Sequence, residues 1–112
     1  MNFRSGLFTL LVLVTISGTA VAQQVLPKIA KDTEYAAARK TLIAQGYQPE
    51  LLADADKCEK DDPRCFPETW RCAGTGLGQC VYVWRRGQAL IEIRTIGEQP
   101  IVDSVRCRAN CR

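Results

Sequence analysis

The sequence predicts a small α+β domain in which one main amphipathic helix packs on a three-stranded antiparallel meander stapled by disulfides. Two neighbouring segments, 79–86 and 89–95, are rich in β-branched and aromatic residues, and the short Arg86-Gly87-Gln88 connection between them is typical of a β-hairpin. A segment with helical periodicity precedes them, and six cysteines lie in the second half of the chain. A chain of 112 residues has room for one such domain.

Residues 1–22 have the three parts of a secretory signal peptide. Arg4 provides the positive start, residues 7–16 form an apolar run, and Ala20-Val21-Ala22 is a small-residue cleavage site. The alternative, an uncleaved membrane anchor, is disfavoured because a spanning helix needs about 20 apolar residues. No cysteine follows the cleavage site, so a lipid anchor is not expected either. We therefore expect a mature domain of residues 23–112, periplasmic or secreted, with no stable membrane anchor.

An even number of cysteines in a short exported chain predicts a disulfide framework. All six lie in the mature part: Cys58, Cys65, Cys72, Cys80, Cys107 and Cys111. Six cysteines allow 15 pairings, which spacing does not settle. The local pairs Cys58–Cys65 and Cys72–Cys80 are favoured because each flanks a turn-rich segment, which leaves Cys107 to pair with Cys111. The alternative is a long-range bond from Cys107 to Cys58, Cys65 or Cys80.

The helix is predicted over residues 33–45, after a loose arm at 23–31. Asp32 can cap it, with Glu34 in the first turn, and Gly46 can end it in a left-handed conformation. Four apolar residues fall on one face at helical spacing and are expected to lie on the sheet: Tyr35, Ala38, Leu42 and Ile43.

An acidic loop follows, with Asp54, Asp56, Glu59, Asp61 and Asp62. An EF-hand calcium loop is excluded, because Glu59 and Cys65 stand where that motif needs a glycine and a glutamate. We therefore expect a solvated loop, with no bound metal or other cofactor. The next residues, Pro67-Glu68-Thr69-Trp70, have the pattern of the first turn of a short helix.

Alternation along the first strand leaves open which face of the sheet is buried. Val81 and Val83 point to one side, and the opposite side carries Cys80, Tyr82 and Trp84. Either set can face the helix.

Two further strands complete the predicted meander. Ile91 and Ile93 alternate with charged residues in the second strand, and a third strand is predicted over 101–108 after a turn at 97–100. One face of this third strand is expected to hold Ile101, Val105 and Cys107. The opposite face of the sheet then carries Glu92, Arg94 and Arg106.

The side chains that most enzymes use are missing. The chain contains no histidine, which removes the commonest general base and the usual metal ligand. The cysteines include no CxxC spacing, so neither a zinc site nor a thioredoxin-like redox site is indicated. Catalysis by paired carboxylates, from the acidic loop or from Glu68 and Glu92, is the enzymatic alternative that the sequence leaves open. We expect no catalytic residues and a protein that is not an enzyme.

The charge is modest but unevenly divided. The formal net charge of +3 becomes +2 without Arg4, which is too small to indicate nucleic acid as a partner. Residues 23–70 hold seven basic and nine acidic groups, or −2, and residues 71–112 hold seven and three, or +4. Complementarity between the two halves is favoured over a charged surface for a partner.

Tryptophan, tyrosine and arginine dominate the energetics of protein–protein contacts, and the predicted hairpin concentrates them. The candidate binding residues are Tyr82, Trp84, Arg85, Arg86 and Arg94. The alternative is that the two aromatic residues are ordinary core and that the arginines form a solvated edge that discourages strand addition.

The order of export signal, helix, cysteine-containing loop and meander resembles small secreted or periplasmic bacterial proteins, through the stretch Pro67-Glu68…Cys72-Ala73-Gly74-Thr75-Gly76…Cys80…Trp84. In outline it is also similar to the helix-on-sheet units of β-lactamase-inhibitory proteins and of outer-membrane assembly lipoproteins. The latter have a lipobox cysteine that this chain lacks. The resemblance covers about two thirds of the mature chain by the order of its elements and implies no functional residue.

The function predicted from the sequence is non-catalytic binding outside the cytoplasm, to a protein partner in the cell envelope, as an inhibitor of a hydrolase or a partner of an envelope protein. The alternatives are a structural or envelope-stress protein without a specific ligand, and a small exported hydrolase that uses carboxylates.

Overall fold

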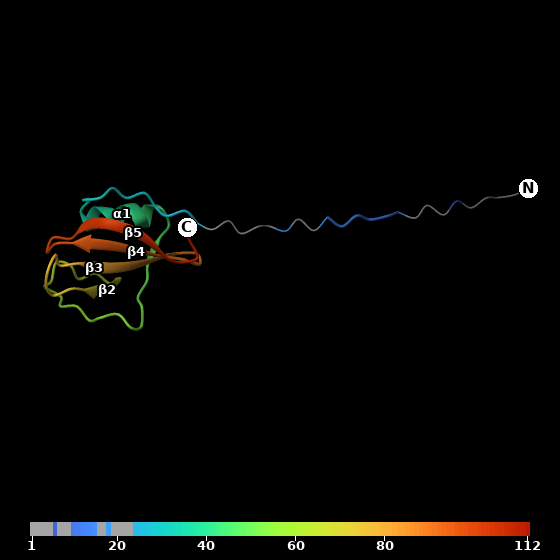
Figure 1. Cartoon of the computed structure of the whole chain (residues 1–112). Helices are drawn as coiled ribbons and strands as arrows, with labels where there is room; N and C mark the ends of the chain where they lie inside the picture. Colours follow the sequence, from blue (N-terminus) through green and yellow to red (C-terminus); the bar gives the residue numbers. More distant parts are fainter. Residues whose placement is uncertain (1–5, 7–9, 16–17, 19–23) are drawn as a thin grey trace, which may run out of the picture.

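The described chain folds as one helix against one face of a five-stranded antiparallel sheet (Figure 1). The computed structural model describes residues 6, 10–15, 18 and 24–112. The helix is α1 (Tyr35–Ala44), and the strands are β1 (Gln48–Pro49), β2 (Thr69–Cys72), β3 (Cys80–Arg86), β4 (Ala89–Ile96) and β5 (Ile101–Ala109).

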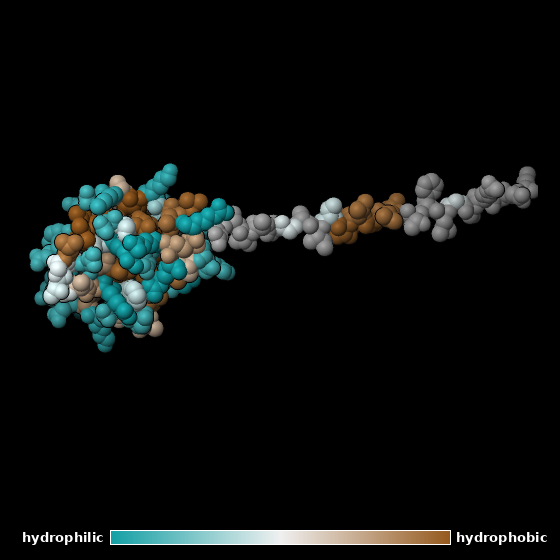
Figure 2. All heavy atoms as spheres, in the orientation of Figure 1, coloured by the Kyte–Doolittle hydropathy of each residue, from teal (hydrophilic) through white to brown (hydrophobic). Residues whose placement is uncertain are grey.

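Most of the predicted signal peptide, including its cleavage site, lies outside the described residues. The described part of its apolar run is solvent-exposed, with Leu10 at 84% and Leu13 at 81% (Figure 2). Within the described residues, no helix is long and apolar enough to cross a membrane.

The predicted three-stranded meander corresponds to β3, β4 and β5, but the sheet is larger. Both β1 and β2 pair with the free edge of β3, β1 opposite Trp84 and Arg85, and β2 opposite residues 80–82. The amide of Val83, between these two stretches, donates to the Glu68 carbonyl at 3.2 Å. Two separate segments therefore share one strand edge, which a pattern within either segment does not reveal.

The helical turn predicted at residues 67–70 is wrong, because Thr69–Cys72 is a strand. Proline at the start of this segment is as compatible with the beginning of a strand as with a first helical turn. Pairing with β3 decides between them, since Thr69 lies opposite Tyr82 and Cys72 opposite Cys80.

The helix begins two residues later than predicted, and Asp32 does not cap it. Asp32 has a φ of 69°, and Glu34 takes the N-cap position without a side-chain hydrogen bond. The amide of Tyr35 donates instead to the Pro100 carbonyl, at 2.9 Å. The first turn of α1 is thus satisfied by the turn before β5, a partner that is distant in sequence.

The end of the helix follows the prediction. Gly46 has a φ of 85° and its amide donates to the Ile43 carbonyl, while the Tyr47 amide donates to the Leu42 carbonyl. This pair of bonds is a Schellman motif, and buried Tyr47 and Leu42 supply its hydrophobic contact. Of the four residues predicted to face the sheet, Tyr35, Ala38 and Leu42 are buried. Ile43 is 54% exposed, because the buried stripe is only one residue wide at this end.

The predicted loose arm is ordered over its described residues. At its start the Gln24 carbonyl accepts a bond from the Arg112 amide at 3.0 Å, and directly after its end the Asp32 amide donates to the Val102 carbonyl at 2.7 Å. Leu26 and Ile29 pack against the core. The arm therefore covers the outer edge of β5, which protects an edge that would otherwise be free to pair with another chain.

A bulge in β5 changes which residues of this strand are buried. Arg94 lies opposite Ser104, but the next residue, Thr95, lies opposite Val102, so Asp103 is the extra residue. One inserted residue moves the following side chains to the other face of the sheet. Val102 is therefore buried, and the prediction that Ile101 shares a face with Val105 is wrong.

The core between α1 and the sheet is largely aromatic. Tyr82 and Trp84 point toward the helix and are fully buried, which settles the choice between the two faces of β3. The Tyr35 and Tyr82 rings stack with centroids 3.8 Å apart, and Phe66 meets Tyr35 edge-on at 5.0 Å. Val83 is also fully buried, on the opposite face.

Three disulfides join Cys58 to Cys65, Cys72 to Cys80 and Cys107 to Cys111, the local pairs that the spacing favours. Cys72–Cys80 links β2 to β3 at directly opposed positions. Three bonds in so short a chain indicate an oxidising environment outside the cytosol.

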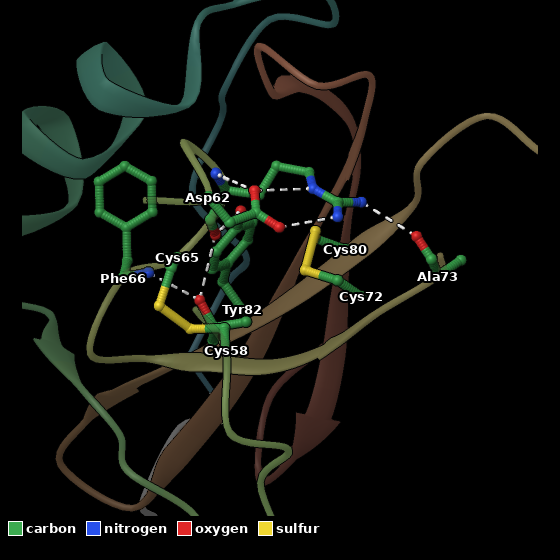
Figure 3. The surroundings of a disulfide bond; sticks show 10 residues. Cys58, Asp62, Cys65, Phe66, Cys72, Ala73, Cys80 and Tyr82 are labelled. Atoms are coloured by element: carbon green, nitrogen blue, oxygen red, sulfur yellow. Dashed lines mark hydrogen bonds and ion pairs between the residues drawn. A yellow bond between two sulfur atoms is a disulfide. The ribbon is translucent and has the colours of Figure 1, made fainter. Parts of the chain in front are cut away.

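Arg64 ties the loop of the first disulfide to the sheet through bonds to Asp62 and Ala73, which are labelled in Figure 3. Its guanidinium donates to both carboxylate oxygens of Asp62, at 3.1 and 2.8 Å, and to the Ala73 carbonyl at 3.0 Å. The Arg64 carbonyl accepts a hydrogen bond from the buried Tyr82 hydroxyl at 2.7 Å. The bonds from Arg64 hold the pKa of the Asp62 carboxyl below its ordinary value.

Candidate functional site

Glu68 is a buried carboxylate between α1 and the sheet, only 1% exposed. The Tyr35 hydroxyl donates to its Oε1 at 2.6 Å, and Arg39 donates through Nε to Oε1 at 2.6 Å and through Nη2 to Oε2 at 3.2 Å. Trp84 Nε1 donates in turn to the Tyr35 hydroxyl oxygen at 3.0 Å. Both oxygens of Glu68 are thus held by protein donors, which gives the carboxylate a structural role in the core.

The two carboxylates considered as a catalytic pair do not meet. Glu68 bonds to side chains of α1, whereas Glu92 lies on the face of the sheet that points away from the helix. Acid–base work on one bond needs two carboxyl groups within about 10 Å that converge on the same space. The sheet lies between Glu68 and Glu92, so this arrangement is not formed.

Burial raises the pKa of Tyr35 and of Tyr82, because a phenolate would lose its hydration in the core. The negative charge of Glu68 and its hydrogen bond raise the pKa of Tyr35 further. The bond to Glu68 also raises the pKa of the Arg39 guanidinium. The network therefore combines neutral Tyr35 with a charged Arg39–Glu68 pair.

We expect alkaline pH to unfold the protein as these tyrosines ionise. Tyrosine in an unfolded chain has a pKa of about 10, and both folded-state values are higher. Their contribution to the free energy of unfolding is therefore complete below about pH 10 and is lost as the pH rises toward the folded-state values.

Tyrosinate absorbance and circular dichroism, followed together over an alkaline titration, check this. Of the three tyrosines, Tyr35 and Tyr82 should ionise only as the structure is lost. Ionisation of all three near pH 10 with the fold intact would contradict the expectation.

Trp70 and two arginines lie across the opposite face of the sheet. The guanidinium carbons of Arg71 and Arg108 are each 4.3 Å from the centroid of a Trp70 ring. Trp70 belongs to β2 and Arg108 to β5, and β3 and β4 lie between these two strands. At the ordinary spacing of neighbouring strands, β2 and β5 are therefore about 14 Å apart. Both side chains must therefore extend over the sheet toward each other.

Glu92 connects the remaining arginines of this face. Its Oε1 accepts a bond from Arg94 Nη2 at 3.0 Å, and its Oε2 accepts one from Arg108 Nη1 at 3.3 Å. Arg106 stands directly opposite Glu92 in β5 and is exposed. We call this surface the arginine face, which consists of Trp70, Arg71, Glu92, Arg94, Arg106 and Arg108.

The five candidate binding residues from the sequence do not form one surface: two lie in the core, two on this side of the sheet and one beside the end of the helix. Tyr82 and Trp84 are fully buried against α1, so neither side chain is available to a partner in this structure. Arg94 belongs to the arginine face. Arg85 forms a two-point ion pair with Glu50, with both N–O distances 2.8 Å.

Arg86 has a different position, beside the end of the helix. It donates to the Gln24 side chain at 2.9 Å and to the Gln45 carbonyl at 3.2 Å, and it lies over the Tyr47 ring. Arg86 therefore fastens the arm and the C-terminus of α1 to the hairpin, which is a structural role.

Sequence reasoning missed Trp70, Arg71 and Arg108 as members of this surface. The sequence pattern predicts a helical turn at Trp70, and Arg108 lies at an irregularity where β5 shifts register against β4. The alternation of charged and apolar residues in the third predicted strand did indicate Arg106.

The acidic loop is anchored to the arginine face at one point. Asp54 accepts a bond from Trp70 Nε1 at 3.2 Å and lies 3.9 Å from Arg71. Within the residues that the structure describes, no three Cys, His, Asp or Glu side chains are placed to hold a metal ion.

Comparison of the chain with protein-family models, curated proteins and solved structures finds no match. The arguments for function therefore come from the arginine face.

Proposed function

We propose that this protein is a non-catalytic binding protein of the periplasm or the extracellular space, and that it holds a protein partner against the arginine face. The partner would be an envelope protein or a hydrolase bound as an inhibitor binds it. The observation that carries the proposal is Trp70 held between Arg71 and Arg108 on a solvent-facing side of the sheet.

Tryptophan and arginine are the residue types most enriched among the contacts that dominate binding energy. On this face they are held before any partner arrives, because stacking and the Glu92 bonds restrict their rotamers. Such preorganisation lowers the entropy lost on association. The side chains still reach solvent, with Arg71 53% exposed and Arg94 40% exposed.

The charge of the surface favours an acidic partner. The arginine face has five aromatic or cationic members and one carboxylate, and it lies in the half of the chain whose formal charge is +4. Complementary charge speeds encounter and disfavours basic competitors.

The test is capture of envelope proteins by the oxidised protein and by two charge-matched variants. Arg71→Glu with Arg106→Glu reverses two exposed charges of the arginine face, and Lys28→Glu with Lys40→Glu reverses two exposed charges on the arm and helix. We expect the first variant to lose its captured proteins and the second to retain them.

Equal capture by both variants would rule out the arginine face as the binding surface. If the unsubstituted protein and both variants are folded but none of them captures a specific protein, the structural or envelope-stress alternative would be favoured.

A further inference from the structure

A cavity of about 120 Å³ opens at one end of the arginine face and is lined by residues of β4 and β5 and of the start of β3. Arg94 and Ser104 line it from directly opposed positions of the two strands, and Arg106 lines it two residues along β5 from Ser104. Opposed and diagonal neighbours on one face of a sheet lie close enough for long side chains to converge.

Three of the residues that line this cavity, Arg94, Thr95 and Ser104, have a buried side-chain polar atom without a hydrogen-bond partner in the protein, and two of them lie directly opposite each other. Arg94 Nε and Ser104 Oγ are both buried from solvent and unpaired. Arg94 uses Nη2 to bind Glu92, so its Nε–H is a separate, unused donor. Buried polar atoms in folded proteins normally have partners, which makes two neighbouring exceptions an indication of a missing ligand.

The charge around the cavity favours an anion. Two of the lining residues, Arg94 and Arg106, are cationic and one, Asp103, is a carboxylate, an excess of one positive charge. Lys31 lies 3.6 Å from Asp103 and offsets its charge. Among the described residues, no carboxylate lies within ion-pair distance of Arg106.

The size of the cavity limits what it can hold. It is smaller than the roughly 300–1,000 Å³ of pockets that enclose whole cofactors or drug-sized ligands. It is nevertheless several times the volume that one water molecule needs. A single small oxyanion group, with oxygens that accept from both an N–H and an O–H donor, fits these limits.

We propose that this cavity binds one oxyanion group, a carboxylate or a phosphate, with Arg94 Nε and Ser104 Oγ as its donors and Arg106 as a second positive charge. The inference rests on the proposed function, since it specifies which group of an acidic partner the arginine face receives. It also predicts that the isolated protein binds small anions at this position.

The test is titration of the oxidised, isotopically labelled protein with inorganic phosphate and, separately, with acetate, followed by nuclear magnetic resonance at constant ionic strength. We expect saturable shifts in the amides of residues 79–81, 94–95 and 103–106. Arg94→Lys keeps the charge but removes the Nε donor, and Ser104→Ala removes the hydroxyl. Each should weaken binding roughly tenfold, as expected for a hydrogen bond to a charged group.

Arg71→Lys is the matched control, because it makes the same change on the arginine face outside the cavity, and it should leave binding unchanged. The proposal would be overturned if Arg71→Lys weakened anion binding equally, or if amide shifts appeared near all the arginines. It would also be overturned if neither anion gave a saturable shift. Tighter binding of acetate would identify a protein carboxylate as the natural group, and tighter binding of phosphate a phosphate ester.

The two proposals fail separately. If neither anion binds but reversal of Arg71 and Arg106 still abolishes capture, the anion site is wrong and the binding face stands. If anions bind but no partner depends on the face, the proposed function is wrong and the isolated cavity remains an anion site.

Discussion

Glu68→Ala is expected to lower the free energy of unfolding by about 3 kcal/mol, because it removes the acceptor of a buried charge pair. Arg39 would keep its positive charge near the core, and the Tyr35 hydroxyl would lose its bond to Oε1. Breaking one side of a fully buried pair costs about 3–5 kcal/mol, and the 24% exposure of the Arg39 side chain places this case at the lower end.

Urea unfolding with the disulfides intact, followed by tryptophan fluorescence, measures this change. Small domains are stable by about 5–15 kcal/mol, so the loss would be a large part of the total. Glu68→Gln should cost less, because it keeps the volume and an acceptor oxygen while losing the charge.

Glu98→Ala is the control at an exposed turn and should change stability by no more than about 0.5 kcal/mol. If Glu68→Ala resembled Glu98→Ala, the Glu68 network would not be the support for α1 that its geometry indicates.

Substitution of the two tryptophans is expected to lower stability to different extents and to abolish partner binding for different reasons. Trp84→Ala should cost about 3–5 kcal/mol, because it leaves a large cavity between α1 and the sheet. It also removes the donor to Tyr35 and one ring beneath the Arg39 guanidinium, which lies 5.6 Å from the Trp84 ring.

Trp70→Ala should cost only about 1–2 kcal/mol, the value of two partly exposed cation–π contacts of roughly 0.5–1 kcal/mol each. This variant should remain folded and lose the proposed partner, whereas Trp84→Ala should lose the partner only by unfolding. Thermal unfolding and partner capture, measured on both variants, separate the two effects. A Trp70→Ala protein as unstable as Trp84→Ala would show that Trp70 belongs to the core.

Much of the fold is predictable from local patterns, because its causes lie within short segments. The hairpin between β3 and β4 follows from two strand-forming segments around Gly87, whose φ of 58° fits the first position of a two-residue turn. The end of α1 follows from Gly46, and the local disulfide pairs follow from cysteines that flank turns. In each case the interacting groups are close in sequence, so the local sequence pattern is enough to predict the structure.

Other features depend on partners that are distant in sequence. Residues 67–70 have weak and mixed local preferences, and their pairing with β3 makes them a strand. The arm has no clear pattern of its own, and the free edge of β5 orders it. The bulge at Asp103 moves Val102 rather than Ile101 into the core, a shift of register that alternation alone does not reveal.

The candidate site likewise has some features that local patterns predict and others that depend on distant partners. Composition placed arginines and aromatic residues on the sheet, but the choice of face depended on which side α1 covers. Because Tyr35, Phe66 and Glu68 form a complementary aromatic and hydrogen-bonded surface for Tyr82 and Trp84, those two side chains are buried. The sequence by itself determined the helix, the three strands of the meander, the disulfide framework and the residue types of the site. The tertiary structure alone decided which of those residues meet, because burial and pairing between distant segments outweigh the weak preferences of each segment.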